Sequence, residues 1–461
     1  MMSETSKKVS KVELIIVISG TLLCMLNQFL VSPAIPAIME QYQVTTGVVQ
    51  WLTNGFTMVC ALMVPMTAFL IQKLSIRNLF LAGMTSFTLG SFLIGSNWFF
   101  GFVLTGRILQ AMGAGVMTPI TQVFLLNSFP KEKRGSAMGM MALVVAFAPA
   151  IGPVLAGLIV DNYGWYWMFR IMAVVSVAVL ASALCVLKKS PGNREISMDI
   201  YSILCSCLGF GGVLYALSTA SDKGFSNPVV LSTLTVGIIA LMLFVKRQIT
   251  LEQPFLDLRI LGISTYRTGV ILIFIANACL AGGTVLIPIF VQNICGYSAT
   301  TSGLIMTPGA IMLGVLSPIV GRIFDKRGPR GLSICGFMLL TLGNFGFCFL
   351  CADWTVGTIG ILYTLRMMGV ALINSPLMTW SMSDLTEEKT AHGVSLFNTL
   401  RQISSSVGTV MMVLVIGMAE KIGYYTQTAT VKGLSMSFGL TAIIGAFALL
   451  LVLKATKPKH K

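Results

Sequence analysis

Charged residues are scarce in this chain of 461 residues: Asp, Glu, Lys and Arg make up 10% of it, and 55% is hydrophobic. A soluble domain carries roughly 25% charged residues, so the composition excludes a water-soluble protein. No long polar stretch interrupts the apolar runs, which excludes a sizeable soluble domain. A chain in lipid must satisfy its backbone hydrogen bonds internally, and continuous apolar runs of about 20 residues predict helices rather than barrel strands.

Acids and histidines are also few. The chain holds 16 Asp and Glu and 2 His, and on the predicted span map every acid falls in a loop or at a span end. A proton relay inside a membrane needs a buried carboxylate or histidine, and the sequence shows neither. The 10 cysteines have no metal-ligand spacing, and no nucleophile constellation is present, so we expect no metal, no cofactor and no enzyme.

The net charge of +15 does not indicate a nucleic-acid partner, because the basic residues occupy short gaps between apolar runs. One set of loops carries nearly all of them, whereas the opposite set holds only Lys223, Lys421 and Lys432. Loops rich in Lys and Arg stay in the cytoplasm, so both termini are predicted there.

Fourteen spans are predicted, an even number that places both termini on one side. They cover residues 13–36, 48–71, 78–96, 99–127, 136–160, 165–187, 199–218, 228–246, 267–292, 301–324, 331–351, 355–380, 393–418 and 433–454.

The chain repeats itself at an offset of 253 residues. Lys73 and the run 88–92 have counterparts in Lys326 and the run 341–345. Parallel repeats of this kind place a substrate site near the membrane midplane, between the halves. The predicted domains are an N-terminal six-helix bundle (1–187), a linker with two extra transmembrane helices (188–265) and a C-terminal six-helix bundle (266–461).

The fifth span carries the strongest motif. Residues 148–157 read APAIGPVLAG, and WYWMF follows at 165–169. This pattern resembles the antiporter motif of major facilitator exporters. Glycine and proline allow close helix approach and bending, so we predict a conformational role for this span. The residues concerned are Pro149, Gly152, Pro153 and Gly157.

Further motifs extend the resemblance along the chain. Arg107, Gln110 and Pro119 have the spacing of a second motif in the fourth span, and the run 26–36 is similar to the first-helix motif of one branch. The usual Asp of that first-helix motif is replaced by Asn27. With these motifs, the chain resembles the fourteen-helix drug/proton antiporter branch of the major facilitator superfamily. The resemblance implies a bacterial inner-membrane exporter of drug-like or amphipathic molecules, working by alternating access and driven by proton entry.

A basic loop motif occurs twice. Residues 321–330 keep it well, whereas the first copy has Gln72 at the customary Asp. The resemblance implies that Asp325 and Arg330 form a charge network at a helix end, which closes one conformation and breaks in the other. The alternative is that these charges only set topology.

Intramembrane arginines are candidates for function, because a charge facing lipid is costly. We expect Arg107 and Arg366 in the cavity, which leaves the midplane net positive and favours neutral or anionic amphiphiles over dications. The motif positions of Asn27 and Gln110 place their amides in the cavity as well. Aromatic residues are candidates for its walls. For each of these residues the alternative is packing against lipid or other helices. The predicted substrate cavity comprises Asn27, Trp51, Phe56, Arg107, Gln110, Arg366 and Trp380.

The predicted partners are an amphipathic small molecule, protons and membrane lipid, and the expected oligomeric state is a monomer. A lipid or peptide exporter of the same fold is the alternative function. A membrane receptor or sensor is the alternative from another class, although the chain has no soluble signalling domain.

Overall fold

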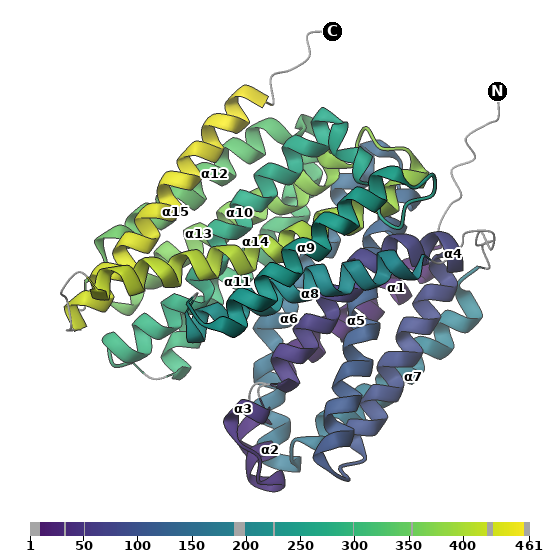
Figure 1. Ribbon diagram of the computed structural model, residues 1–461, viewed down its shortest axis with the longest axis horizontal. Coiled ribbons are helices and arrows are strands. Elements are labelled where there is room, and N and C mark those ends of the chain that lie inside the picture. The colour runs from purple at the N-terminus through teal and green to yellow at the C-terminus, as the bar shows by residue number, and fades with distance from the viewer. Residues whose placement is uncertain are drawn as a thin grey trace.

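The computed structural model of this protein describes residues 10–31, 34–49, 51–188, 199–224, 226–297, 299–351, 354–421 and 427–455. These residues form helices and short connections (Figure 1). The helices are α1 (Lys11–Leu30), α2 (Ile35–Tyr42), α3 (Thr46–Val49), α4 (Trp51–Gly95), α5 (Phe100–Ser128), α6 (Arg134–Tyr163), α7 (Tyr166–Val186), α8 (Ile200–Lys223), α9 (Pro228–Thr250), α10 (Ser264–Ile289), α11 (Ala299–Arg327), α12 (Pro329–Gly346), α13 (Val356–Ser381), α14 (Glu387–Lys421) and α15 (Gln427–Ala455).

Local chemistry explains several helix boundaries. The Ser10 hydroxyl accepts from the Val12 amide at 3.2 Å, and Glu13 accepts from the Ser10 amide at 3.0 Å, a capping box that starts α1. The side chain of Asn227 caps α9, whose first residue is Pro228.

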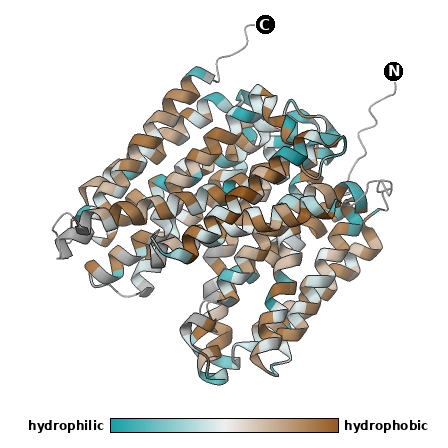
Figure 2. Cartoon of the chain, viewed as in Figure 1, coloured by the Kyte–Doolittle hydropathy of each residue, from teal (hydrophilic) through white to brown (hydrophobic). Residues whose placement is uncertain are grey.

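Twelve helices of the described chain are long and apolar enough to cross a membrane. Figure 2 shows hydrophobic residues along the length of the helices and hydrophilic ones gathered toward the ends of the bundle. The protein is therefore a multi-pass helical membrane protein, as its composition predicted.

α4 is a run of 45 residues that breaks at Ser75, where φ is 66° and ψ is 158°. Its two segments run in opposite directions along α5, so the chain folds back at Ser75. The contacts that establish this are Leu52–Arg107 and Cys60–Ala111 in the first segment, and Gly83–Gly113 and Gly90–Gly106 in the second.

The same turn recurs between α11 and α12. Gly328, at φ 72°, lies 253 residues after Ser75, which is the offset of the sequence repeat. Positive φ suits glycine and strains serine, so the first copy keeps the geometry of the turn without its preferred residue.

Packing within each half repeats as well. A Cβ on Gly113 would meet the carbonyl oxygen of Gly83, and a Cβ on Gly369 would lie 2.7 Å from the carbonyl oxygen of Gly336. The α4–α5 pair and the α12–α13 pair therefore use the same close glycine contact.

The two halves lie side by side at the end of the bundle that carries both chain termini, and their ribbons diverge toward the opposite end (Figure 1). We call the first end the basic end; it is where Gln72, Gly135, Asp257, Asp325 and His392 meet. We call the opposite end the far end. There, Gln41 contacts both Asn97 and Trp165.

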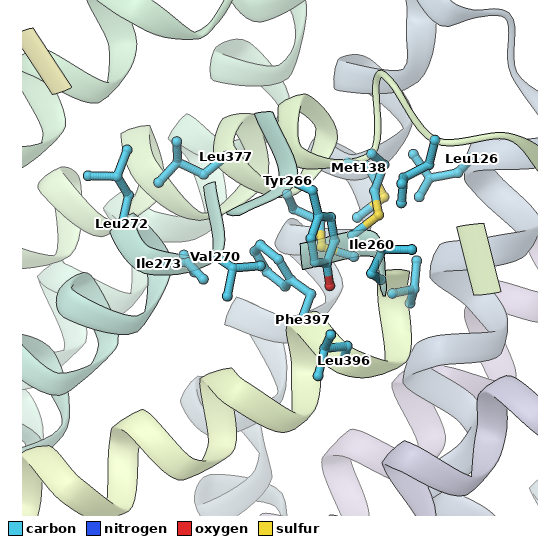
Figure 3. Close-up of a cluster of buried hydrophobic side chains, with 14 of the residues drawn as sticks. Leu126, Met138, Ile260, Tyr266, Val270, Leu272, Ile273, Leu377, Leu396 and Phe397 are labelled. Carbon is cyan, nitrogen blue, oxygen red and sulfur yellow. The ribbon is translucent and has the colours of Figure 1, made fainter. Parts of the chain in front are cut away.

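A buried apolar cluster joins the halves near the basic end (Figure 3). Leu126 and Met138 come from α5 and α6, whereas Tyr266, Leu377 and Phe397 come from α10, α13 and α14. The Tyr266 hydroxyl donates to the Gly393 carbonyl at 2.8 Å, which satisfies the polar atom inside this cluster.

The insert helices α8 and α9 pack on each other at Gly212 and Gly237, and α8 also contacts α4 and α14. Asp199, which precedes α8, accepts from Arg247 Nε near the end of α9 at 2.6 Å. The hydrogen bonds from this guanidinium lower the pKa of the Asp199 carboxyl.

Candidate functional site: the contact between the halves and its cavity

Asp325, at the end of α11, binds the first turn of α6 from the other half. Its carboxylate accepts from the Gly135 amide at 2.7 Å, from the Ser136 amide at 2.8 Å and from the Ser136 hydroxyl. A carboxylate at a helix N-terminus satisfies free amides and interacts favourably with the helix dipole. No ion pair joins Asp325 to Arg330 among the described residues. The partner of Asp325 is thus the α6 N-terminus rather than the predicted arginine.

Backbone contacts continue this seam along α6 and α11. A Cβ on Gly135 would lie 2.6 Å from the Gly321 carbonyl oxygen, and one on Gly139 would lie 2.6 Å from the Ser317 carbonyl oxygen. The two helices therefore touch through their main chains at the basic end.

The other copy of the loop motif makes a neutral contact. Gln72 lies 2.7 Å from His392 Nε2, and His392 Nδ1 accepts from the Asp257 amide at 3.2 Å. The structure places Gln72 Nε2 at this position. Because Nδ1 accepts, Nε2 carries the proton, and the Gln72 amide has to be turned over to present its oxygen as the acceptor. One imidazole thus connects α4, α14 and the end of the insert.

Behind this seam lies a cavity of about 70 Å³. Both halves contribute its walls, and no Asp or Glu is among the residues that line it. The lining residues are Gln122, Met138, Met141, Ala142, Val145, Leu313, Ser317, Ala371, Asn374, Ser375, Met378, Phe397 and Arg401.

Arg401 of α14 is the charged residue among those that line this cavity. Its side chain is half-buried, and its guanidinium makes no hydrogen bond, ion pair or ring contact within the described part of the chain. Nearby, Asn398 Nδ2 donates to Gln122 Oε1 at 2.5 Å, across the two halves, and the buried Asn398 Oδ1 and Ser375 Oγ lack partners. The cavity therefore offers polar groups that the protein itself does not satisfy.

Four of the predicted cavity residues form a separate cluster inside the N-terminal half. Gln110 Oε1 accepts from Asn27 Nδ2 and from Arg107, both at 3.0 Å, and the Arg107 guanidinium lies 4.1 Å from the centre of the Phe56 ring. Arg107 also donates to the Leu52 carbonyl at 3.0 Å. These side chains are buried. A guanidinium away from water must be hydrogen-bonded, and the Gln110 side chain and the Leu52 carbonyl meet that need. Their contact with substrate stays a prediction.

Arg366 is fully buried in the C-terminal half. It donates to the carbonyls of Cys279 at 3.1 Å and Leu280 at 3.3 Å, and it lies 5.4 Å from the Phe438 ring and 5.8 Å from the Phe347 ring. The structure does not bring it into the cavity wall, since protein groups already surround it.

The two predicted tryptophans lie apart from each other. Trp51 is 46% exposed and stacks on Tyr215 of α8 with ring centres 6.5 Å apart. Trp380 is half-buried and packs against the apolar cluster between the halves. Neither lines the cavity of Arg401.

The glycines of the fifth-span motif differ in their surroundings. A Cβ on Gly152 would lie 2.9 Å from the Phe29 Cβ of α1, whereas one on Gly157 would meet no described atom within 4 Å. Only Gly152 has the close helix contact that the motif predicted. The side chains of Pro149 and Pro153 fall outside the described part of the chain.

The sequence predicted a site between the halves but not the residues that line this cavity, although one signal was present. Arg401 is an arginine well inside an apolar span, about 21 Å from the start of α14 at roughly 1.5 Å per residue. Its lack of a partner depends on packing between helices far apart in sequence, so no pattern indicated it.

Two similar helical halves with a sealed contact at one end and a cavity between them are the architecture of a membrane transport protein. The sequence matches the Major Facilitator Superfamily over residues 17–409. The chain belongs to that superfamily, a family of transporters rather than enzymes, as its motifs predicted.

Relatives of known sequence place it more closely. It is 37% identical over 449 residues to an uncharacterized transporter of this superfamily, YcnB of Bacillus subtilis, covering 96% of this chain and 95% of that one. It is 34% identical to the lincomycin resistance protein LmrB of Bacillus subtilis, covering 94% and 91%. It is 28% identical to the multidrug export protein EmrB of Escherichia coli, covering 85% and 77%.

Solved structures agree on the fold. The human organic anion transporter MFSD10 superimposes with a TM-score of 0.69 at 11% identity, covering 98% of this chain and 100% of that one. The xylose symporter XylE gives a TM-score of 0.62 at 12% identity, covering 96% and 95%.

Proposed function

We propose that this protein exports drug-like or amphipathic small molecules across the bacterial cell membrane by alternating access, coupled to proton entry. The observation that carries the proposal is the bond from Asp325 of one half to the α6 N-terminus of the other, with a cavity behind it. Such a contact is a discrete element that can be made or broken as a whole, which alternating access requires. Similarity to the lincomycin resistance protein LmrB and the multidrug export protein EmrB supports the substrate class and the direction.

The proposal includes fourteen membrane crossings. Beyond the twelve candidate spans, the fold of α4 at Ser75 supports two crossings by that helix. α6, with 30 residues, is long enough for one more. The proposed arrangement is two six-helix bundles, 1–187 and 266–461, with α8 and α9 as the additional pair.

The basic end is proposed to face the cytoplasm. Lys73, Lys133 and Lys326 belong to the loops and helix ends that meet there, and basic loops are retained on the cytoplasmic side. Both termini then lie in the cytoplasm, and the far end faces outward.

Purified protein in liposomes tests the proposal. We expect an imposed proton gradient to drive a fluorescent amphiphile against its concentration gradient, and a protonophore to abolish the flux. Protein-free liposomes are the control. Flux that does not depend on the proton gradient would contradict proton coupling but not transport. If no amphiphile is transported, the receptor alternative is favoured.

A further inference from the structure

The cavity between the halves contains a positive charge that the protein does not neutralise. The wall residues include no acid, and Arg401 has no hydrogen-bonding or ionic partner in the described chain. A half-buried guanidinium in apolar surroundings is unfavourable unless a ligand or water satisfies it.

The contrast with the other intramembrane arginines is informative. Arg107 is held by an amide and a carbonyl, and Arg366 by two carbonyls and two rings. Both are bound by the protein inside one half. Arg401 differs because it faces a space to which both halves contribute.

Other wall residues suit a negatively charged group with an apolar body. The Asn374 amide makes no hydrogen bond within the described residues, and Gln122 has its oxygen engaged by Asn398, so its amide nitrogen remains as a donor. Met138, Met141, Val145, Leu313, Met378 and Phe397 supply the apolar surface. Methionine adapts to varied shapes, which suits a site for amphiphiles.

We propose that Arg401 is the anion-binding residue of the transport cavity and selects amphipathic organic anions that carry one carboxylate or sulfonate. The planar guanidinium donates two parallel hydrogen bonds to such a group. A cavity of about 70 Å³ has room for about two water molecules, so in this conformation it holds the charged group alone. The apolar body enters when the halves separate. This inference rests on the proposed export function.

The test uses the full chain and three probes with one fluorescent body: an alkyl sulfonate, the matching alcohol and the matching trimethylammonium compound. The sulfonate stays charged at every working pH, so proton effects do not enter. Binding is measured by fluorescence titration in detergent, and flux is measured in liposomes. The variants are Arg401→Gln, Arg401→Lys and, as the matched control, Arg267→Gln, which removes one exposed charge at the start of α10.

We expect Arg401→Gln to weaken sulfonate binding about tenfold or more and to leave alcohol binding unchanged. Arg401→Lys keeps the charge but not the paired donors, so its loss is smaller. Arg267→Gln binds all three probes as the wild type does.

Three results with the variants, and one with the wild-type protein, would overturn the inference. The first is unchanged sulfonate binding in Arg401→Gln. The second is an equal loss for sulfonate and alcohol, which indicates a structural role. The third is misfolding of both Arg401 variants, because an arginine without a partner adds no stability. If the wild-type protein binds and moves none of the three probes, the proposed function itself fails; if it moves the alcohol alone, only this inference fails.

Discussion

Each half of the protein buries one arginine in the second helix of its glycine-packed pair, α5 or α13, but the two arginines are held differently. In α5, Arg107 shares the Gln110 side chain with Asn27. In α13, Arg366 takes the register of Gln110, since it packs on Gly343 as Gln110 packs on Gly90. It has no side-chain hydrogen-bond partner among the described residues and relies on carbonyls and rings. The arginine of the N-terminal half therefore has a side-chain partner, whereas that of the C-terminal half depends on the backbone of α10.

The largest expected effect follows from this difference. Arg366→Ala removes the hydrogen bonds to the Cys279 and Leu280 carbonyls and opens space beside Phe347 and Phe438, so we expect a loss of about 3 kcal/mol or more in unfolding free energy. Arg107→Gln should lose less, because Gln110 keeps its bond to Asn27. Thermal unfolding in detergent compares the two variants. Equal losses would show that the amide network does not compensate.

The second prediction compares two glycines of one helix. Gly152→Leu should lower transport at least tenfold with folded protein still in the membrane, because the new side chain meets Phe29. Gly157→Leu should transport normally, since no described atom lies near its Cβ. Flux in liposomes and the folded yield are measured for both. A block by Gly157→Leu would indicate that its neighbours form only in another conformation.

A third comparison concerns the two copies of the loop motif. Asp325→Asn weakens a charged contact with the α6 N-terminus, worth about 1 kcal/mol, so we expect the population open at the basic end to rise roughly fivefold. Gln72→Ala removes a neutral contact and should shift it less. Spin-label distances across the basic end report both. A larger shift from Gln72→Ala would place the main closure at His392 instead.

The smallest expected effect is that of Asn27→Asp. A carboxylate there would lie beside the Gln110 side chain that Arg107 also contacts, and its attraction to Arg107 should raise the unfolding free energy by about 1 kcal/mol. Because that pair lies inside one half, cation flux should gain little. Thermal unfolding and uptake of a quaternary ammonium dye test this. A large gain in dye uptake would mean that position 27 contacts substrate after all.

The sequence predicted a multi-pass helical membrane protein of this superfamily, because hydrophobic runs and short motifs are local patterns. The positive φ at Ser75 and at Gly328 was not predicted, although the two positions are separated by the 253-residue offset of the sequence repeat. The partners of the charged residues could not be predicted. Asp325 binds a helix that begins 191 residues earlier in the chain, and the isolation of Arg401 depends on five helices meeting around it. The rule that an intramembrane arginine faces a cavity applies equally to Arg107, Arg366 and Arg401. Only the carbonyls and amides of neighbouring helices determine which of them is bound by the protein, and the sequence does not show these contacts.

The bare backbone contact between Gly135 and Gly321 also bears on how the cell keeps its ion gradients. A seal of side chains leaks when a rotamer flips, on a timescale of nanoseconds, whereas two touching main chains separate only when whole helices move. A continuous chain of water molecules through this point would let ions cross and dissipate the membrane potential, which is worth about 2.3 kcal/mol per charge at 100 mV. At the Gly135–Gly321 contact, opening therefore requires whole helices to move, and this slows any leak of ions through the resting protein.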